Sequence, residues 1–319
     1  HKVIGVDDLS NGKKLNIPKK CKFYRLDLSD KVKLNKINTN IDQIFHLAGQ
    51  SSGEKSFEDP IKDLEKNTIS TLNLINFAIR KKVKKLIFAS SQSVYGNVDD
   101  IAVSEKYKVN PLSCYGNSKL SSENYLKIFK DKLPYVIFRI NNVYGYGQDL
   151  DNLKQGMVSI YLAQALKNNK IIVKGSLNRF RDFVHIDDVV DCWIRAALNR
   201  NIKNVIFNLG TGKKTYVKEI LNIILLEDQN YNSNIPSTST AAPKGKELTL
   251  IAALVCLPPS PNIFEIKSDA PFKTFGWSIK ESVELTYPVS LIHPLTLSKL
   301  PHFFLSCAKI FNAHSFAAS

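Results

Sequence analysis

Tyr115 and Lys119 lie four residues apart in the segment SCYGNSKLSSENYLKIF, which starts as a loop and continues in a helical pattern. At that spacing the two side chains share one face of a helix. A tyrosine with its usual pKa near 10 is a poor base at neutral pH. A neighbouring ammonium favours the phenolate and lowers that pKa, which would let the phenolate take a proton from an alcohol. Alone, the spacing is common by chance and usually marks surface packing.

Three companions make the chemical interpretation of this pair stronger. Ser91 ends the apolar run KKLIFASS, Asn67 lies on the helical pattern before it, and Asp7 ends the first apolar run, KVIGVD. An acid at the end of a strand is where dinucleotide-binding units hold a ribose, although a turn residue is the simpler reading of Asp7 alone. Ser91 could hydrogen-bond the hydroxyl that is oxidised, and Lys119 could hold ribose hydroxyls. The set predicts reversible alcohol–ketone chemistry with a nicotinamide cofactor that carries the hydride.

Short apolar runs and helical patterns alternate through the first two thirds of the chain. The expected strands are residues 2–7, 22–28, 41–49, 84–91 and 133–145, with a helix over 63–82. Near-continuous apolar strands alternating with helices predict an α/β fold with a doubly wound parallel sheet. In such sheets ligands bind beyond the carboxyl ends of the strands. The polar or small residues that fall there are Asp7, Asp27, Ala48, Gly49, Ser91, Asn141 and Asn142.

The pattern loosens after about residue 150. We expect a helix over 157–169, a strand pair at 170–175 and 179–186, a helix over 186–200 and a strand that begins at 205. The segment GTGKKT lacks the first glycine of a phosphate loop, since Phe207 stands in its place, so a turn is expected. We predict a cofactor domain over 1–150, to which 178–212 returns, and a smaller substrate domain over 151–319. Residues 231–262 and 288–319 resemble linker or atypical sequence.

Composition limits the classes of partner. The net charge is +15, but the lysines are scattered along the chain. The densest run, KKVKK at 81–85, is expected to be a solvated helix end. Nucleic-acid binding is therefore not expected. The five cysteines are widely spaced and predict neither disulfides nor a metal site. No signal peptide is expected, and the longest apolar stretch is too short for a bilayer. These features indicate a cytoplasmic protein without a membrane partner.

Many of these segments, in this order, resemble one known family. They are DDLSNG, LDL, HLAGQSSGEKSFEDP, NTISTLNL, FASSQSVYG, YGNSK, RINNVYGYGQ and RFRDFVHIDDVVD, and they cover roughly residues 2–225. Together they resemble the extended short-chain dehydrogenase/reductase family. Within it the chain is most similar to NAD-dependent nucleotide-sugar epimerases of the UDP-glucose 4-epimerase type. The resemblance implies a Rossmann-like fold, NAD as the cofactor, a UDP-sugar substrate and a homodimer.

The resemblance also implies roles for individual residues. The catalytic residues would be Ser91, Tyr115 and Lys119. The residues implied to contact NAD are Asp7, Asn11, Gly12, Asp27, Leu28, Leu47, Ala48, Gly49, Asn67, Tyr115, Lys119 and Asn141. Ser91, Asn142, Val158 and Arg181 would face the nucleotide sugar, with Arg181 suited to a two-pronged contact with the diphosphate. A local salt bridge between Arg181 and Asp182 is an equally good reading of that pair.

The segment SSQSVYG bears on the reaction. Relatives that eliminate water or carbon dioxide resemble one another in an acidic residue two positions after the catalytic Ser or Thr, whereas this chain has Ser93 there. Without that carboxylate no base is evident for carbon 5 of a 4-keto sugar. C4 epimerisation of a UDP-hexose needs no such base and is favoured. A 4,6-dehydratase, a decarboxylase or a 4-keto sugar reductase is the alternative.

Two features depart from the family pattern. The first strand with its G-x-x-G-x-x-G loop, which holds the pyrophosphate at a helix N-terminus, would come before His1. Arg200 is the last arginine of the chain, whereas relatives usually bring a second arginine to the nucleotide from the C-terminal domain. We therefore expect an N-terminally truncated chain that lacks a central strand, and a catalytically inactive fragment is the other hypothesis.

Overall fold

The computed structural model describes residues 1–98, 101–153, 156–168, 171–173 and 175–233. Its strands are β1 Ile4–Asp7, β2 Lys22–Arg25, β3 Gln43–His46, β4 Lys85–Ser91, β5 Tyr135–Ile140, β6 Asn142–Tyr144, β7 Phe180–Arg181, β8 Phe183–His185, β9 Val205–Leu209 and β10 Thr215–Tyr216. Its α-helices are α1 Lys31–Asn35, α2 Gly53–Glu58, α3 Pro60–Leu64, α4 Ser70–Arg80, α5 Cys114–Ile128, α6 Met157–Asn168, α7 Ile186–Leu198 and α8 Val217–Ser233. A π-helical turn, η2 Glu65–Ile69, joins α3 to α4, and η1 Lys14–Asn16 and η3 Gln92–Tyr95 are 3₁₀ turns.

The main sheet is parallel and has the strand order β3–β4–β5–β9. Each of these strands is followed or preceded by a helix that returns the chain to the same end, which is the crossover that parallel pairing requires. β1 and β2 pair in parallel with each other as a separate sheet. Within the described residues, neither β1 nor β2 pairs with a strand of the main sheet.

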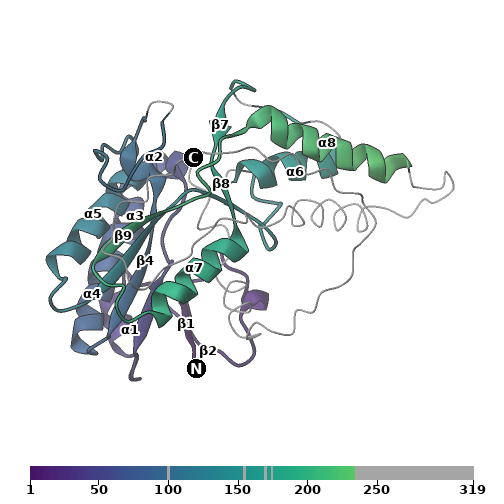
Figure 1. Cartoon of the computed structure of the whole chain (residues 1–319). Helices are drawn as coiled ribbons and strands as arrows, with labels where there is room; N and C mark the ends of the chain where they lie inside the picture. Colours follow the sequence, from purple (N-terminus) through teal and green to yellow (C-terminus); the bar gives the residue numbers. More distant parts are fainter. Residues whose placement is uncertain (99–100, 154–155, 169–170, 174, 234–319) are drawn as a thin grey trace.

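Helices cover both faces of the main sheet (Figure 1). Successive side chains of a strand point to opposite faces, so Leu86 and Phe88 of β4 pack with α1, α4 and α5. Ile87 and Ala89 pack on the other face, against Trp193 and the rest of the apolar side of α7. Because both faces are buried, every residue of β4 and β5 is buried. The predicted doubly wound α/β fold is confirmed.

A smaller lobe is built from α6, α8, β7 and β10, with Val158, Leu162 and Ile224 in its own apolar cluster. β7 pairs antiparallel with β10, and β8 pairs in parallel with β6. The predicted strand at 170–175 is wrong: residues 171–173 have no regular structure, and β10 takes the place beside β7. β9 returns to the main sheet beside β5. The domain boundaries stay predictions.

The lysine run at 81–85 differs from its prediction at one position. Lys82 lies in a turn with φ 53° after α4, and Lys84 makes an exposed ion pair with Asp42. Lys85, however, is buried, and its ammonium donates to the carbonyls of Ala196 and Asn199 at 2.8 and 2.7 Å. Those carbonyls lie at the carboxyl end of α7, where a cation is favourable. Lys85 therefore holds α7 against the sheet.

Several sequence features lie outside the described residues, namely Cys256, Cys307, nearly all of 231–262 and all of 288–319. Within the described part, Cys21, Cys114 and Cys192 are free thiols. No helix of that part is long and apolar enough to cross a membrane. No group of three or more His, Cys, Asp or Glu side chains there is placed to hold a metal ion.

Candidate active site

Ser91 and Tyr115 meet where β4 ends and α5 begins. The Ser113 hydroxyl accepts a hydrogen bond from the Gly116 amide at 3.0 Å and so caps the start of α5. Tyr115 lies in the first turn of that helix. Both Ser91 and Tyr115 are 2% exposed, and the Ser91 side chain lies near enough to Tyr115 to lower its pKa. The Ser91 hydroxyl also accepts from the Ser93 hydroxyl at 3.0 Å. The structure therefore brings the two predicted catalytic side chains together at the junction of β4 and α5.

Lys119 lies one turn further along α5, on the same face as Tyr115. Its ammonium lies 5.1 Å from the Phe88 ring centroid and 5.7 Å from that of Tyr115. Burial lowers the pKa of Lys119 to about 8, although the carboxylate of Asp63 acts in the opposite direction. A lysine with this pKa is a cation at neutral pH that is close to losing its proton.

The ionisation of Tyr115 differs from the expectation. Burial raises the pKa of Tyr115, and the negative charge of Asp63 adds to that rise, while the hydrogen bond with Ser91 lowers it. The residues of the chain alone therefore do not bring this pKa down. Desolvation outweighs the effect of Ser91, because a phenolate in an apolar site loses its hydration.

Asn67 and Gly49 form one wall beside Lys119. Asn67 is 1% exposed and lies in the π-helical turn η2, a feature that is frequent at functional sites. A Cβ at position 49 would collide with the Asn67 side-chain oxygen and lie 3.4 Å from the Lys119 ammonium, so only glycine fits there. That oxygen is buried and accepts no hydrogen bond within the described part of the chain. It is an acceptor directed at the space next to Lys119.

Asp63 is a buried carboxylate that we did not single out from the sequence. It is 1% exposed, and its side chain accepts from Gln50 Nε2 at 2.9 Å, Asn67 Nδ2 at 2.9 Å and Ser118 Oγ at 2.7 Å. Burial raises the pKa of Asp63, while the three donors and Lys119 act against that rise. The four-residue spacing of Asp63 and Asn67, which places both on one helix face, was the available signal.

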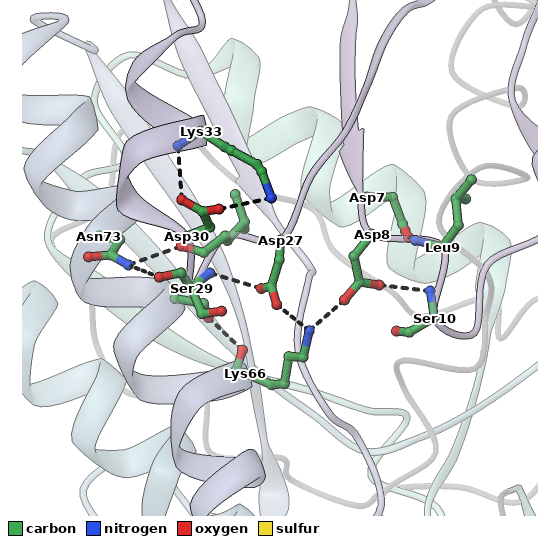
Figure 2. A network of polar contacts seen from close by, with 12 residues as sticks. Asp7, Asp8, Leu9, Ser10, Asp27, Ser29, Asp30, Lys33, Lys66 and Asn73 are labelled. Carbon is green, nitrogen blue, oxygen red and sulfur yellow. Dashed lines mark hydrogen bonds and ion pairs between the residues drawn. The ribbon is translucent and has the colours of Figure 1, made fainter.

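Another acidic cluster lies at the carboxyl ends of β1 and β2 (Figure 2). Asp7 accepts from the Leu9 amide at 2.6 Å, and burial raises its pKa. The Lys66 ammonium, from η2, bridges Asp8 and Asp27 at 2.6 Å each (Figure 2). Burial acts to raise the pKa of both aspartates. The hydrogen bonds and charge of Lys66, together with hydrogen bonds from Ser10 to Asp8 and from Ser29 to Asp27, outweigh it and hold the pKa of each below its usual value. Lys66 precedes Asn67 and was also missed from sequence.

The other predicted cofactor residues are placed as follows. Gly12 packs against Asp7, since a Cβ there would lie 3.3 Å from its carboxylate, and Asn11 precedes it in the same loop. Leu28 and Leu47 are buried in the two core clusters, and Ala48 packs against one of them. Asn141 donates to Asp182 at 3.2 Å. The structure thus brings Asn11 and Gly12 to Asp7, while Leu28 and Leu47 contribute chiefly to the core.

The predicted substrate residues are more dispersed. Asn142 is 7% exposed and donates its side-chain amide to the Asp182 carbonyl at 3.1 Å. Val158 is buried in the core of the smaller lobe. The Arg181 guanidinium donates to the Phe180 carbonyl at 2.9 Å.

The alternative salt bridge between Arg181 and Asp182 is not formed. Asp182 instead accepts from the amides of Thr211 and Gly212 at 2.9 Å each, and from the Thr211 hydroxyl at 2.7 Å. These contacts shape the turn after β9, where Gly212 has φ 71°. The segment GTGKKT is therefore a turn held by Asp182, as predicted, and Arg181 is not neutralised by its neighbour.

The side chains at the carboxyl ends of the strands fit the two sugar ends of a dinucleotide. Ribose hydroxyls donate to carboxylates and amide oxygens and accept from ammonium groups, which matches Asp7 at one end and Asn67 with Lys119 at the other. The unpaired Asn67 oxygen and the glycine at position 49 fit a ligand that passes between them. The described residues do not include a glycine-rich loop for the pyrophosphate.

The fold is that of a dinucleotide-dependent α/β enzyme, and the site brings a Ser, a Tyr and a Lys side chain together at the carboxyl end of its sheet. Residues 1–210 match the model of the NAD dependent epimerase/dehydratase family. The chain belongs to that family, whose cofactor is NAD. A protein of Methanocaldococcus jannaschii, provisionally named a UDP-glucose 4-epimerase, is 38% identical over 226 residues, which are 70% of this chain and 73% of that protein.

Solved structures of similar proteins agree with this assignment. The UDP-glucose 4-epimerase of Thermotoga maritima, solved with UDP-glucose, has a TM-score of 0.68 at 33% identity and covers 77% of this chain and 79% of its own. That of Thermus thermophilus, solved with NAD, has a TM-score of 0.65 at 30% identity and covers 78% and 84%. The predicted family and cofactor are confirmed.

Proposed function

We propose that this chain carries the active site of an NAD-dependent C4 epimerase of a UDP-hexose. The observation that carries the proposal is the burial of Ser91, Tyr115 and Lys119 in one place, with the Lys119 ammonium 5.7 Å from the Tyr115 ring centroid. Relatives and structural neighbours named UDP-glucose 4-epimerase support the substrate class. Ser91, Tyr115 and Lys119 are the residues that we assign to the reaction.

Each of the three residues has a separate task. The Ser91 hydroxyl would hydrogen-bond the sugar C4 oxygen. Burial raises the pKa of Tyr115, so its phenolate would form with the help of the positive charge of bound NAD, and it would then accept the proton of the C4 hydroxyl and later return it. The positive charge of Lys119 lies beside Tyr115 and also favours ribose hydroxyls as partners. Bound NAD would supply the hydride acceptor and donor for carbon 4, and return of hydride to the opposite face of the ketone would invert that carbon. Proton and hydride both return to the sugar, so the reaction has no net redox change.

The group at position 93 favours epimerisation over elimination. Ser93 donates to Ser91 and is a hydroxyl, which cannot act as a base at carbon 5 of the 4-keto sugar at neutral pH. Asp63, a carboxylate in the same region, is occupied by hydrogen bonds from three side chains. The ketone is therefore left to be reduced again on either face.

The rest of the substrate site is also a proposal. Arg181, which is half-buried and has no carboxylate partner among the described residues, would bind the diphosphate. Asn142 would lie along the nucleotide sugar. We further propose that the active form is a homodimer, as the resemblance to the family implies.

The first test is to purify the chain of 319 residues, denature it and measure released NAD by mass spectrometry. Stoichiometric NAD supports the proposal, and assays of UDP-glucose and UDP-galactose interconversion then follow by chromatography of the two sugars. No NAD and no interconversion would support the inactive-fragment hypothesis. Formation of a 4-keto-6-deoxy sugar or loss of carbon dioxide from a UDP-uronate would contradict epimerisation.

A further inference from the structure

Asp63 has contacts that no catalytic role assigned above explains. It is 1% exposed, and its two oxygens receive hydrogen bonds from three side chains in three parts of the chain. Gln50 follows β3, Asn67 lies in η2, and Ser118 lies on α5 directly before Lys119. A carboxylate that accepts from three donors is fixed in place, and its charge cannot move toward solvent.

The hydrogen-bond pattern fits the ionised form of Asp63. Asp63 Oδ1 accepts from both Gln50 and Asn67, and Oδ2 accepts from Ser118. All three partners act as donors, which is the arrangement that a carboxylate needs. A proton on Oδ2 would compete with the Ser118 hydroxyl for the same position. The site therefore holds a buried negative charge.

Asp63 acts on Lys119: it is hydrogen-bonded to Ser118, the residue before Lys119, and its negative charge acts to raise the pKa of the Lys119 ammonium. The charged and titratable groups that interact with Lys119 are Asp63 from α3, His46 from β3 and Tyr115 from its own helix. Burial lowers the pKa of His46 to about 3, so His46 is neutral at physiological pH and gives Lys119 no counter-charge. Asp63 is left as the anion that offsets the burial of the Lys119 ammonium.

We propose that Asp63 is a positioning residue which keeps Lys119 in its ammonium form and fixes Lys119 relative to Asn67 and the loop after β3. The inference deepens the proposed function, because it assigns a second group on which the Tyr115 and Lys119 pair depends. Asp63 does not contact substrate. It acts through the charge of Lys119 and through the hydrogen bonds to Ser118 and Asn67.

The test measures the titration of the Lys119 side chain in the unmodified full chain and in variants, by NMR of lysine labelled with ¹³C at the ε-carbon. The Lys119 signal is assigned by its loss in Lys119→Arg. Asp63→Asn retains groups that can hydrogen-bond Gln50, Asn67 and Ser118 but removes the charge. We expect it to lower the Lys119 midpoint by about one pH unit, as loss of a nearby opposite charge does.

Two variants separate the charge from the hydrogen bonds. Asp59→Asn, an exposed residue at the start of the same α3 helix that caps it through the Lys62 amide, is the matched control. It removes one negative charge and keeps a good capping residue, and the Lys119 midpoint should not change. Ser118→Ala keeps the charge and removes one donor, so it should lower the unfolding midpoint and leave the Lys119 midpoint in place.

An Asp63→Asn variant that folds but leaves the Lys119 midpoint unchanged overturns the proposal. If that variant does not fold, the side-chain carboxyl ¹³C signal of Asp63 in the unaltered chain decides. An ionised Asp63 at pH 7 supports the proposal, and a protonated one contradicts it. None of these measurements requires bound NAD. An inactive chain would therefore contradict the proposed function but would not contradict this inference.

Discussion

Glu123 of α5 and Arg139 of β5 form a buried, two-pronged ion pair. The Arg139 Nε and Nη2 atoms lie 2.9 and 2.7 Å from the two carboxylate oxygens, and Glu123 also accepts from the Ser90 hydroxyl at 2.6 Å. Glu123 lies four residues after Lys119 on α5, on the same helix face. The pair therefore ties α5, the helix that carries Tyr115, to β5, and the Ser90 hydrogen bond ties it to β4, the strand that ends in Ser91.

Glu123→Gln leaves the Arg139 charge buried without its anion. We expect the free energy of unfolding to fall by about 3 to 5 kcal/mol, the usual cost of breaking a buried pair from one side. Asp191→Asn is the control, because the Asp191–Arg195 pair on α7 is about half exposed and such pairs contribute about 0 to 1 kcal/mol. Urea unfolding followed by circular dichroism measures both. Equal losses in the two variants would contradict the structural role of Glu123.

Tyr115→Phe removes the proposed proton acceptor and keeps the ring that packs beside Lys119. We expect sugar interconversion to fall at least about 100-fold, in the range that general acid–base groups contribute. NAD content after purification should be unchanged, since the phenol oxygen is one contact among several. Tyr125→Phe makes the same chemical change on the same helix, away from Ser91, and should leave both measurements unaltered. Full activity in Tyr115→Phe would refute the assignment.

Lys66→Met removes the cation shared by Asp8 and Asp27. The two carboxylates then repel each other across the mouth of the expected adenosine site, and the pKa of each should rise toward its usual value. We expect NAD to bind about ten-fold more weakly, which corresponds to about 1.4 kcal/mol. Isothermal titration calorimetry with NAD measures this. Lys62→Met, on exposed α3 surface, is the control, and a Lys66→Met affinity equal to that of Lys62→Met would argue against the bridge.

His46 makes stability depend on acid. Burial lowers its pKa in the folded chain to about 3 from 6.5, so the unfolded chain binds one more proton between these pH values. Stability is therefore lost as the pH falls from about 6.5 toward 3, by about 1.4 kcal/mol per pH unit from this group. His46→Leu should show a shallower fall in unfolding free energy over this range. Parallel curves for the two proteins would show that His46 is not the cause.

The order of strands and helices could be predicted from sequence because it follows from local patterns. Continuous apolar runs such as the one ending at Ser91 identify strands buried on both faces, and the spacing of Tyr115 and Lys119 identifies one helix face. The strand expected at 170–175 failed because two residues of β10 pair with β7 instead. A two-residue strand has too little sequence to leave a periodic signal.

The sequence by itself determined the fold class, the family and the catalytic types, since motif order and strand ends are properties of the chain. Only the tertiary structure decided which charged side chains lie next to one another. The hydrogen bond of Asp63 with Ser118 and the bridge of Lys66 between Asp8 and Asp27 both join side chains from different elements. Contacts between elements are set by packing and burial, and the pKa of Tyr115 likewise depends on desolvation, which no spacing along the chain encodes.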